Sequence, residues 1–234
     1  MVEGPARGSA SPGAYASGFV AAVLIVSPHL DDAALSCWSL LALGAEGRGS
    51  PAAAPVTVLD VCAGLPPEGV VGEWDARGGA TSSRDRVRQR RLEEAAALAA
   101  TGARLVLLDL LDWQYGPEGE DVAAVLAPYL AGAGWVYAPA GIGGHHDHLR
   151  VRDAVLALHP EAVLYADLPY ALRHGFEPPL PGYEPEEVAL DTAVAAAKVA
   201  ALALYVTQVS LLEADYGPVL DARGLAREVF FHRV

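Results

Sequence analysis

Short apolar runs alternate along the chain with longer stretches in which apolar and polar positions recur at helical spacing. Runs rich in β-branched and aliphatic residues predict strands, and stretches with one apolar face predict helices. The predicted strands cover residues 21–26, 56–61, 105–108, 135–138, 162–166 and 228–231. The predicted helices cover residues 32–44, 84–101, 122–130, 150–158 and 189–212. This alternation, with no internal repeat, indicates an α/β fold whose mostly parallel sheet is covered by helices on both faces.

Three stretches lack such a pattern. Residues 1–18 are rich in Gly, Ala, Ser and Pro and are predicted to form a flexible N-terminal arm, which leaves residues 19–234 as a single domain. Residues 68–83 are long for an unstructured connection, so we expect a functional loop or lid there. Prolines cluster in residues 178–185, where no strand is predicted.

Size and composition limit the functional classes. The 234 residues suffice for one sizeable α/β domain, and 53 % of them are hydrophobic. No apolar run is long enough to span a membrane, and the first one lacks the basic flank of a secretory signal. With 29 acidic and 16 basic residues the net charge is −13, which disfavours nucleic acids and anionic membranes as partners. Cys37 and Cys62 lie in apolar segments and are expected to be buried thiols. We therefore expect a cytoplasmic protein that neither binds nucleic acid nor inserts into a membrane.

The candidate chemistry begins where the first predicted strand ends. Pro28 cannot continue a central strand, and His29, Asp31 and Asp32 follow it at the start of a predicted helix. Open parallel sheets place their active sites on such strand-to-helix turns. His29 and Asp32 can supply two ligands to a zinc ion, which in catalytic sites usually takes three protein ligands and a water. Because neighbouring side chains point in different directions, one of the two carboxylates can bind metal while the other accepts a proton from water, as metal-assisted hydrolysis requires.

A second polar turn follows the fourth predicted strand. It contains His145, His146, Asp147 and His148, so that the two turns together hold four of the seven histidines. His145 and His148 are three residues apart and share a face on a helical turn, so one can bind the metal while the other faces the substrate. Asp147 can orient a histidine ligand. Since both turns follow strands of one sheet, we prefer a metal site over a capped helix start and an unrelated surface loop.

The two turns resemble those of a known family. Pro28-His29-Leu30-Asp31-Asp32 and His145-His146-Asp147-His148 are similar to the (Pro/Ala)-His-Pro-Asp-Asp-Glu and His-Pro-Asp-His signatures of the PIG-L/LmbE-like family of zinc-dependent N-deacetylases. The resemblance extends from about Val23 to beyond Tyr205. It includes the second strand, an arginine-rich helix that ends at Gly102, and Lys198 with the segment Tyr205-Val206-Thr207-Gln208.

The resemblance implies a single Rossmann-like domain and specific roles for the residues of the two turns. Zinc, or another divalent metal, would be bound by His29, Asp32 and His148. Asp31 would be the general base that deprotonates the metal-bound water. His145, when protonated, would steady the tetrahedral oxyanion and protonate the leaving amine. Asp147 completes the predicted catalytic set.

The resemblance also implies two substrate contacts. Counted back from Gly102, the substrate-contacting arginine of the family falls on Arg90, with Arg91 as the alternative. The acidic residue after the third strand, which would contact sugar hydroxyls, falls on Asp112, with Asp109 as the alternative.

Three positions depart from the family signatures. Leu30 and His146 replace the two prolines, and the first change should leave its turn less rigid. Ala33 replaces a glutamate, which removes an acid that would support the ligands. None of the three changes removes a predicted ligand.

Three further groups of residues have an interpretation from position alone. Aromatic rings in predicted rim loops offer surfaces for stacking on a sugar, with core packing as the alternative, and these are Trp74, Trp113 and Tyr115. Tyr165 and the segment 167–170 follow another strand and are expected to wall the pocket. The arginines of residues 84–91 are expected to form a solvated helix face that would also attract a phosphate.

Taken together, these features predict a hydrolase. It would remove an acyl group, expected to be acetyl, from an N-acylated amino sugar or its small-molecule conjugate by attack of an Asp31-activated, zinc-bound water. An amidase acting on a thiol conjugate or another non-sugar amide stays open, and so does a non-catalytic member that binds a glycan or small ligand, for which Ala33 is the best support. A nucleotide-binding protein is disfavoured because no Gly-x-Gly-x-x-Gly follows the first strand. The sugar, acyl group, aglycone and pathway stay open, as does assembly into a homo-oligomer.

Overall fold

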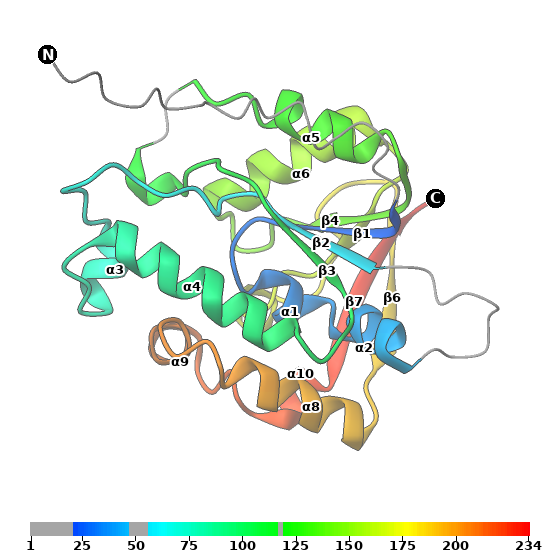
Figure 1. Cartoon of the computed structure of the whole chain (residues 1–234). Helices are drawn as coiled ribbons and strands as arrows, with labels where there is room; N and C mark the ends of the chain where they lie inside the picture. The colour runs from blue at the N-terminus through cyan, green and yellow to red at the C-terminus, as the bar shows by residue number, and fades with distance from the viewer. Residues whose placement is uncertain (1–20, 47–55, 117–118) are drawn as a thin grey trace, which may run out of the picture.

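The computed structural model describes residues 21–46, 56–116 and 119–234, and these residues form a seven-stranded sheet with helices on both faces (Figure 1). The strand order is β3-β2-β1-β4-β5-β7-β6, in which β1 to β5 pair in parallel and β7 pairs antiparallel with both β5 and β6. The strands are β1 (Ala21–Ser27), β2 (Val56–Asp60), β3 (Arg104–Leu107), β4 (Ala133–Pro139), β5 (Val163–Tyr165), β6 (Tyr183–Ala189) and β7 (Arg227–Arg233). The predicted α/β class with a mostly parallel sheet is confirmed.

The helices form two layers. Helices α5 and α6 pack on each other and on β4, on one side of the sheet (Figure 1). On the other side, α1 and α2 pack on β1 and β2, and α8 packs against α1, α2 and α4. The helices are α1 (Asp32–Ser36), α2 (Trp38–Glu46), α3 (Glu73–Arg77), α4 (Ser83–Leu98), α5 (Val122–Leu130), α6 (His146–Leu158), α7 (Tyr170–His174), α8 (Thr192–Leu202), α9 (Val209–Tyr216) and α10 (Ala222–Leu225). A 3₁₀ turn, η2 (Trp113–Tyr115), follows β3.

The core lies on the central strands. Leu24, Ile25 and Val26 are fully buried, and every residue of β2 is buried. A parallel strand covered on both faces has no polar side, which explains why these runs are continuously apolar rather than alternating. Polar residues therefore return only where these strands end, in the loops that carry the candidate site.

The chain reverses its direction of travel across the sheet next to β1. It runs outward from β1 to β2 and β3, and then crosses back to β4 on the other side of β1. The loops after β1 and β4 consequently leave the same edge of the sheet in opposite directions, and ligands bind in the crevice that opens at such a point. The crossover therefore brings residues 28–32 next to residues 140–148.

Two predicted helices are each divided. The helix predicted over residues 32–44 breaks at Cys37, where the backbone N–H groups of Trp38 and Ser39 donate to the Glu228 carboxylate at 2.8 and 2.9 Å. Glu228 lies on β7 and is held by Lys198 Nζ at 2.6 Å, so a buried acid from the end of the chain supplies the N-terminal cap of α2. The helix predicted over residues 189–212 is likewise two helices, α8 and α9.

Two predicted loops contain regular structure. The proline-rich segment includes the start of β6, which is the edge strand of the sheet. An edge strand tolerates proline, because the N–H that proline lacks is not needed on the side without a neighbour. The segment 68–83 contains α3. The predicted N-terminal arm, residues 1–18, lies outside the described residues.

Candidate active site

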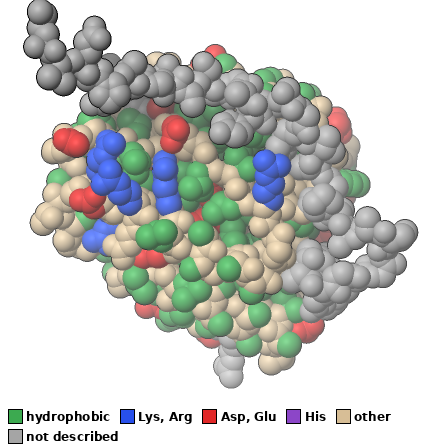
Figure 2. All heavy atoms as spheres, viewed as in Figure 1, with side chains coloured by type: hydrophobic (Ala, Val, Ile, Leu, Met, Phe, Trp, Pro, Cys, Tyr) green, Lys and Arg blue, Asp and Glu red, His purple; other side chains and the backbone are tan. Residues whose placement is uncertain are grey.

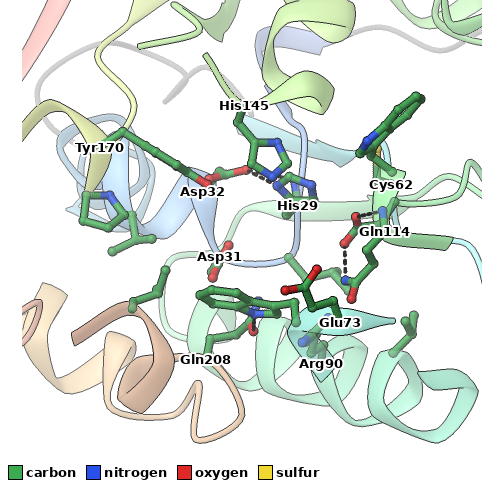
Figure 3. A pocket seen from close by; sticks show the side chains of 18 of the residues that line it. His29, Asp31, Asp32, Cys62, Glu73, Arg90, Gln114, His145, Tyr170 and Gln208 are labelled. Carbon is green, nitrogen blue, oxygen red and sulfur yellow. Dashed lines mark hydrogen bonds and ion pairs between the residues drawn. The ribbon is translucent and has the colours of Figure 1, made fainter. Parts of the chain in front are cut away.

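The two polar turns meet at the crevice. Asp32 Oδ2 lies 3.3 Å from His29 Nδ1 (Figure 3) and 3.2 Å from His148 Nε2, although His29 and His148 come from loops after different strands. His148 Nε2 is buried, faces this carboxylate and forms no hydrogen bond with any described residue. Two imidazole nitrogens and a carboxylate oxygen together are the donor set that a divalent metal such as zinc takes. The residues present therefore fit a metal ion.

Each histidine of this group is held through its other ring nitrogen. His148 Nδ1 lies 2.6 Å from Asp167 Oδ1, and Asp167 Oδ2 accepts from the backbone N–H of Ile142 at 2.8 Å. His29 Nε2 lies 3.0 Å from Asp147 Oδ2, which also accepts from the N–H of Trp113 at 3.0 Å. These carboxylates assign the protons to His148 Nδ1 and His29 Nε2, so the opposite nitrogens keep a lone pair for a metal.

The electrostatics of the group favour a cation between the side chains. Burial by itself lowers the pKa of His148, but the charge of Asp32 and the hydrogen bond to Asp167 raise it to about 9. Burial by itself raises the pKa of Asp32, but His148 and His29 bring it far below its usual range. The pocket thus holds an ionised carboxylate that favours positive charge on the neighbouring histidines. A bound metal ion would supply that positive charge in place of protons.

Asp31 lies beside this group with a different environment. It is 6 % exposed and lines the cavity between the histidines and the wall formed by Gln208 and Arg90 (Figure 3). Burial, and then the charge of Asp32, raise its pKa to about 7. Two neighbouring carboxylates therefore have opposite tendencies, because one is stabilised as the anion and the other gains and loses a proton near neutral pH.

His145 is the third histidine at the site. Its ring centre lies 4.9 Å from that of His29 and 5.1 Å from that of His148. Burial, and then the charges of His29 and His148, lower its pKa to about 3. Its Nδ1 accepts from the N–H of Asp147 at 3.3 Å and so caps α6. The neutral ring consequently carries its proton on Nε2.

The structure distinguishes between the alternative substrate contacts. Arg90 lines the cavity, 4 % exposed and paired with Asp75 at 2.6 Å, whereas Arg91 binds the carbonyl of Ala63 and reaches Asp109 at 3.0 Å. Asp112 lines the cavity, whereas the Asp109 side chain is 90 % exposed. Arg90 and Asp112 are thus the members of each pair that can reach a ligand.

A cavity of about 490 Å³ opens over these groups, which is enough for a sugar conjugate. All three predicted rim aromatics line it, and Tyr170 contributes from α7. The loop before α6 approaches Tyr170 so closely that a Cβ on Gly143 would lie 2.9 Å from the Tyr170 ring. Tyr165 does not wall the cavity as expected, because it is fully buried and its hydroxyl donates to the carbonyl of Val26 at 3.0 Å.

The segment 68–83, expected to be a loop or lid, forms a fixed wall. Trp74 Nε1 donates to Gln208 Oε1 at 3.0 Å, which ties α3 to the region after α8. Glu73 and Gln114 line the cavity, and Asp75 and Asp167 hold residues of the site, roles that the sequence analysis did not assign to them. Asp75 meets Gln114 and Tyr115 across 39 and 40 residues of chain, and Asp167 meets His148 across 19, so no local spacing identifies these contacts.

The arginines of residues 84–91 do not form one solvated face. Arg84 donates to the carbonyl of Pro66, Arg86 to that of Gly78, and Arg88 pairs with Asp85 at 2.7 Å. In Figure 2 the Lys and Arg side chains lie in a few separate groups among apolar and neutral atoms on that face. Among the described residues, no helix is both long and apolar enough to cross a bilayer.

Comparison with known proteins decides the family. Residues 24–159, more than half of the chain, match the family described as PIG-L, GlcNAc-PI de-N-acetylase. The chain belongs to the PIG-L family. The resemblance inferred from the two turns is therefore confirmed.

Individual relatives are deacetylases. The chain is 36 % identical over 169 residues to 2′-N-acetylparomamine deacetylase of Streptomyces fradiae, a match that covers 63 % of this chain and 57 % of that protein. This chain thus matches a little over half the length of that relative. Among solved structures, the A40926 pseudoaglycone deacetylase Dbv21 is 29 % identical with a TM-score of 0.76, covering 92 % of this chain and 97 % of that one. A triple mutant of the deacetylase Orf2 of the teicoplanin pathway is 28 % identical with the same TM-score, covering 91 % and 97 %.

The three departures from the PIG-L signatures each have a local environment here. Leu30 is 3 % exposed and packs with Val87 and Tyr115 beside the cavity. His146 is exposed and stacks on Trp113, with ring centres 3.7 Å apart. Ala33 is fully buried in α1, so this member holds its histidines through Asp147 and Asp167 without an acid at residue 33.

Proposed function

We propose that this PIG-L protein is a metal-dependent hydrolase that removes an acetyl group from an N-acetylated amino sugar or its conjugate. One observation carries the proposal: Asp32 Oδ2 lies 3.3 Å from His29 Nδ1 and 3.2 Å from His148 Nε2, and His29, Asp31 and Asp32 line the cavity. Support also comes from the relatives, which are deacetylases named for aminoglycoside and glycopeptide substrates.

Side chains of the two turns would divide the work. His29, Asp32 and His148 would hold a divalent ion, for which zinc suits the donor set, and such an ion polarises a carbonyl and makes water more acidic. Asp31 would take the proton from the attacking water, since its pKa of about 7 lies near the working pH of a general base. His145, neutral rather than protonated as the resemblance implied, would donate a hydrogen bond from its Nε2–H to the carbonyl oxygen as negative charge develops there.

The leaving amine also needs a proton. A carboxyl group with a pKa of about 7 can release a proton as readily as it accepts one, so protonated Asp31 is positioned to return it to the nitrogen. Asp147 and Asp167 would hold the tautomers of His29 and His148 throughout, because each carboxylate is fixed by a backbone N–H as well.

The test combines metal analysis with a substrate panel. Purified protein should contain or bind one divalent ion and release acetate from methyl N-acetylglucosaminide or from 2′-N-acetylparomamine. An N-acetylated thiol conjugate without a sugar serves as the comparison for a general amidase. Bound metal with no acetate from any member of the panel would leave a ligand-binding protein and refute the hydrolase.

A further inference from the structure

The carboxylates that line the cavity form two groups. Asp31 and Asp32 lie at what we call the inner half, where a divalent ion would balance their charges. Glu73, in the first turn of α3, and Asp112, at the start of η2, define what we call the outer half, and Gln114, which lies beside Glu73 (Figure 3), donates to Asp112 at 2.7 Å. We assign this outer half to the part of a substrate beyond the reacting sugar.

Among the described residues, the outer carboxylates form no ion pair. Glu73 is exposed, forms no hydrogen bond there either, and points into the cavity beside Gln114 and Arg90 (Figure 3). The Asp112 carboxylate accepts from neutral groups, the backbone and side-chain N–H of Gln114 at 3.0 and 2.7 Å. Neither carboxylate is thus paired with a cation in the part of the chain that the structure describes.

The basic residues nearby are already paired. Arg90 is the only arginine or lysine that lines the cavity in the described part of the chain, and its charge is balanced by buried Asp75, which also accepts from the Tyr115 hydroxyl at 2.7 Å. Arg77, which lies over the Trp74 ring, is bound through two nitrogens by Asp215 at 3.0 and 2.7 Å. A phosphate or carboxylate on the substrate would therefore meet Glu73 and Asp112 without a free cation to offset them.

Aromatic surface lies next to the two carboxylates. Trp74 and Trp113, which follow Glu73 and Asp112 directly in the chain, also line the cavity, and Trp113 is 51 % exposed. Carboxylates combined with indole rings are the usual surroundings of a bound ammonium group. We propose that the substrate is an N-acetylated amino sugar whose conjugate carries at least one further protonated amine, which Glu73 and Asp112 bind. This inference rests on the proposed function, because it assigns the acetylated ring to the inner half of the cavity.

The experiment compares three probes of different charge. The probe 2′-N-acetylparomamine carries free amines on its second ring, methyl N-acetylglucosaminide is neutral, and N-acetylglucosamine 1-phosphate is anionic. We expect the highest kcat/KM for the amine probe, and we expect that value alone to fall as salt is added. Replacing Glu73 with glutamine should lower kcat/KM for the amine probe about two- to five-fold, the range of an exposed ion pair, and should lower it less for the neutral probe.

Charge reversal gives a sharper result. Glu73→Lys should lower the amine-to-anion preference by about tenfold or more, since it replaces attraction by repulsion for one probe and does the opposite for the other. Glu68→Lys is the matched control, because Glu68 is exposed in the same segment and does not line the cavity. Calorimetric affinity for paromamine provides a readout that needs no turnover, and it should weaken in the Glu73 variants only.

The outcomes separate the two proposals. Acetate release with equal kcat/KM for all three probes, insensitive to Glu73, would overturn the amine assignment and leave the deacetylase standing. Paromamine binding that depends on Glu73, with no acetate from any probe, would overturn the deacetylase and support the amine site. Stronger binding of the anionic probe by the unaltered protein would refute the charge argument directly.

Discussion

Replacing Asp31 with asparagine should abolish turnover and at the same time stabilise the metal-free fold. Asparagine has the shape of aspartate but cannot accept a proton from water. The Asp31 carboxylate is almost completely buried next to Asp32, so its negative charge is costly to the folded protein. The same substitution therefore removes a catalytic group and relieves a repulsion.

Both effects have a magnitude. Loss of a general base lowers kcat about 10²- to 10⁴-fold. The pKa of Asp31 rises from 3.8 to about 7, and a shift of about 3 pH units corresponds to about 4 kcal/mol of destabilisation once the group is ionised in both states. The folded state holds the proton more tightly than the unfolded chain, so this cost grows as pH rises from about 4 to about 7 and is complete above that. Because Asp31 and Asp32 interact, about 4 kcal/mol is an upper bound.

The assay measures acetate release, metal content and unfolding. Thermal unfolding of the protein and the Asp31→Asn variant, both in chelator, should show a stability gain that is larger at pH 8 than at pH 5. Asp153→Asn is the control, since Asp153 is exposed and paired only with Arg152 at 2.8 Å. The Asp31→Asn variant should still bind the metal, because His29 and Asp32 are unchanged.

Either half of the result can fail separately. Full activity of Asp31→Asn would exclude Asp31 as the base. A stability difference that is absent or does not depend on pH would show that the carboxylate is better solvated than its burial implies. Loss of the metal together with activity would shift Asp31 from a base to a ligand.

Three further predictions follow from buried charges. Asp167→Asn should weaken divalent-metal affinity about 10- to 100-fold, measured by competition with a chelator, because it removes the partner of His148; unchanged affinity would contradict the positioning role. Glu94→Gln should gain more stability at pH 8 than at pH 5. Burial is the main cause that raises the pKa of Glu94 from 4.5 to about 8, so the stability of the unaltered protein falls as pH rises through that interval. Equal melting temperatures of the variant and the unaltered protein at pH 8 would refute this. Lys198→Met should lower the free energy of unfolding in urea by about 3–5 kcal/mol, because it leaves the Glu228 charge buried and unpaired. Adding Glu228→Gln should recover part of that loss. No recovery would show that the loss comes from packing instead.

The order and types of the strands and helices were largely predictable. The strands β1, β2 and β4 and the helix α5 match the predicted positions within about two residues, because burial on both faces of a sheet imposes continuous apolar runs that a single sequence displays. The prediction was wrong where a distant group intervenes. Glu228 divides the first predicted helix at Cys37, and no feature near Cys37 indicates that a carboxylate arrives there from β7.

The candidate site was predictable as a set of residue types at two strand ends. Its assembly depended on the crossover from β3 to β4, which places His148 against Asp32. The choice between Arg90 and Arg91 depended on which side of α4 faces the cavity. The role of Asp167 could not be predicted at all, since only the neighbouring positions of β4 and β5 in the sheet bring it to His148.

The sequence by itself determined the class of fold, the family and the chemical nature of the candidate ligands, because each of these is encoded in local spacing and in short turns. Only the tertiary structure decided which carboxylates hold the histidines, which arginine faces the cavity and that neither Glu73 nor Asp112 pairs with a cation among the described residues. Those properties come from contacts between residues far apart in the chain, and such contacts are set by how helices pack on the sheet rather than by any pattern within a single segment.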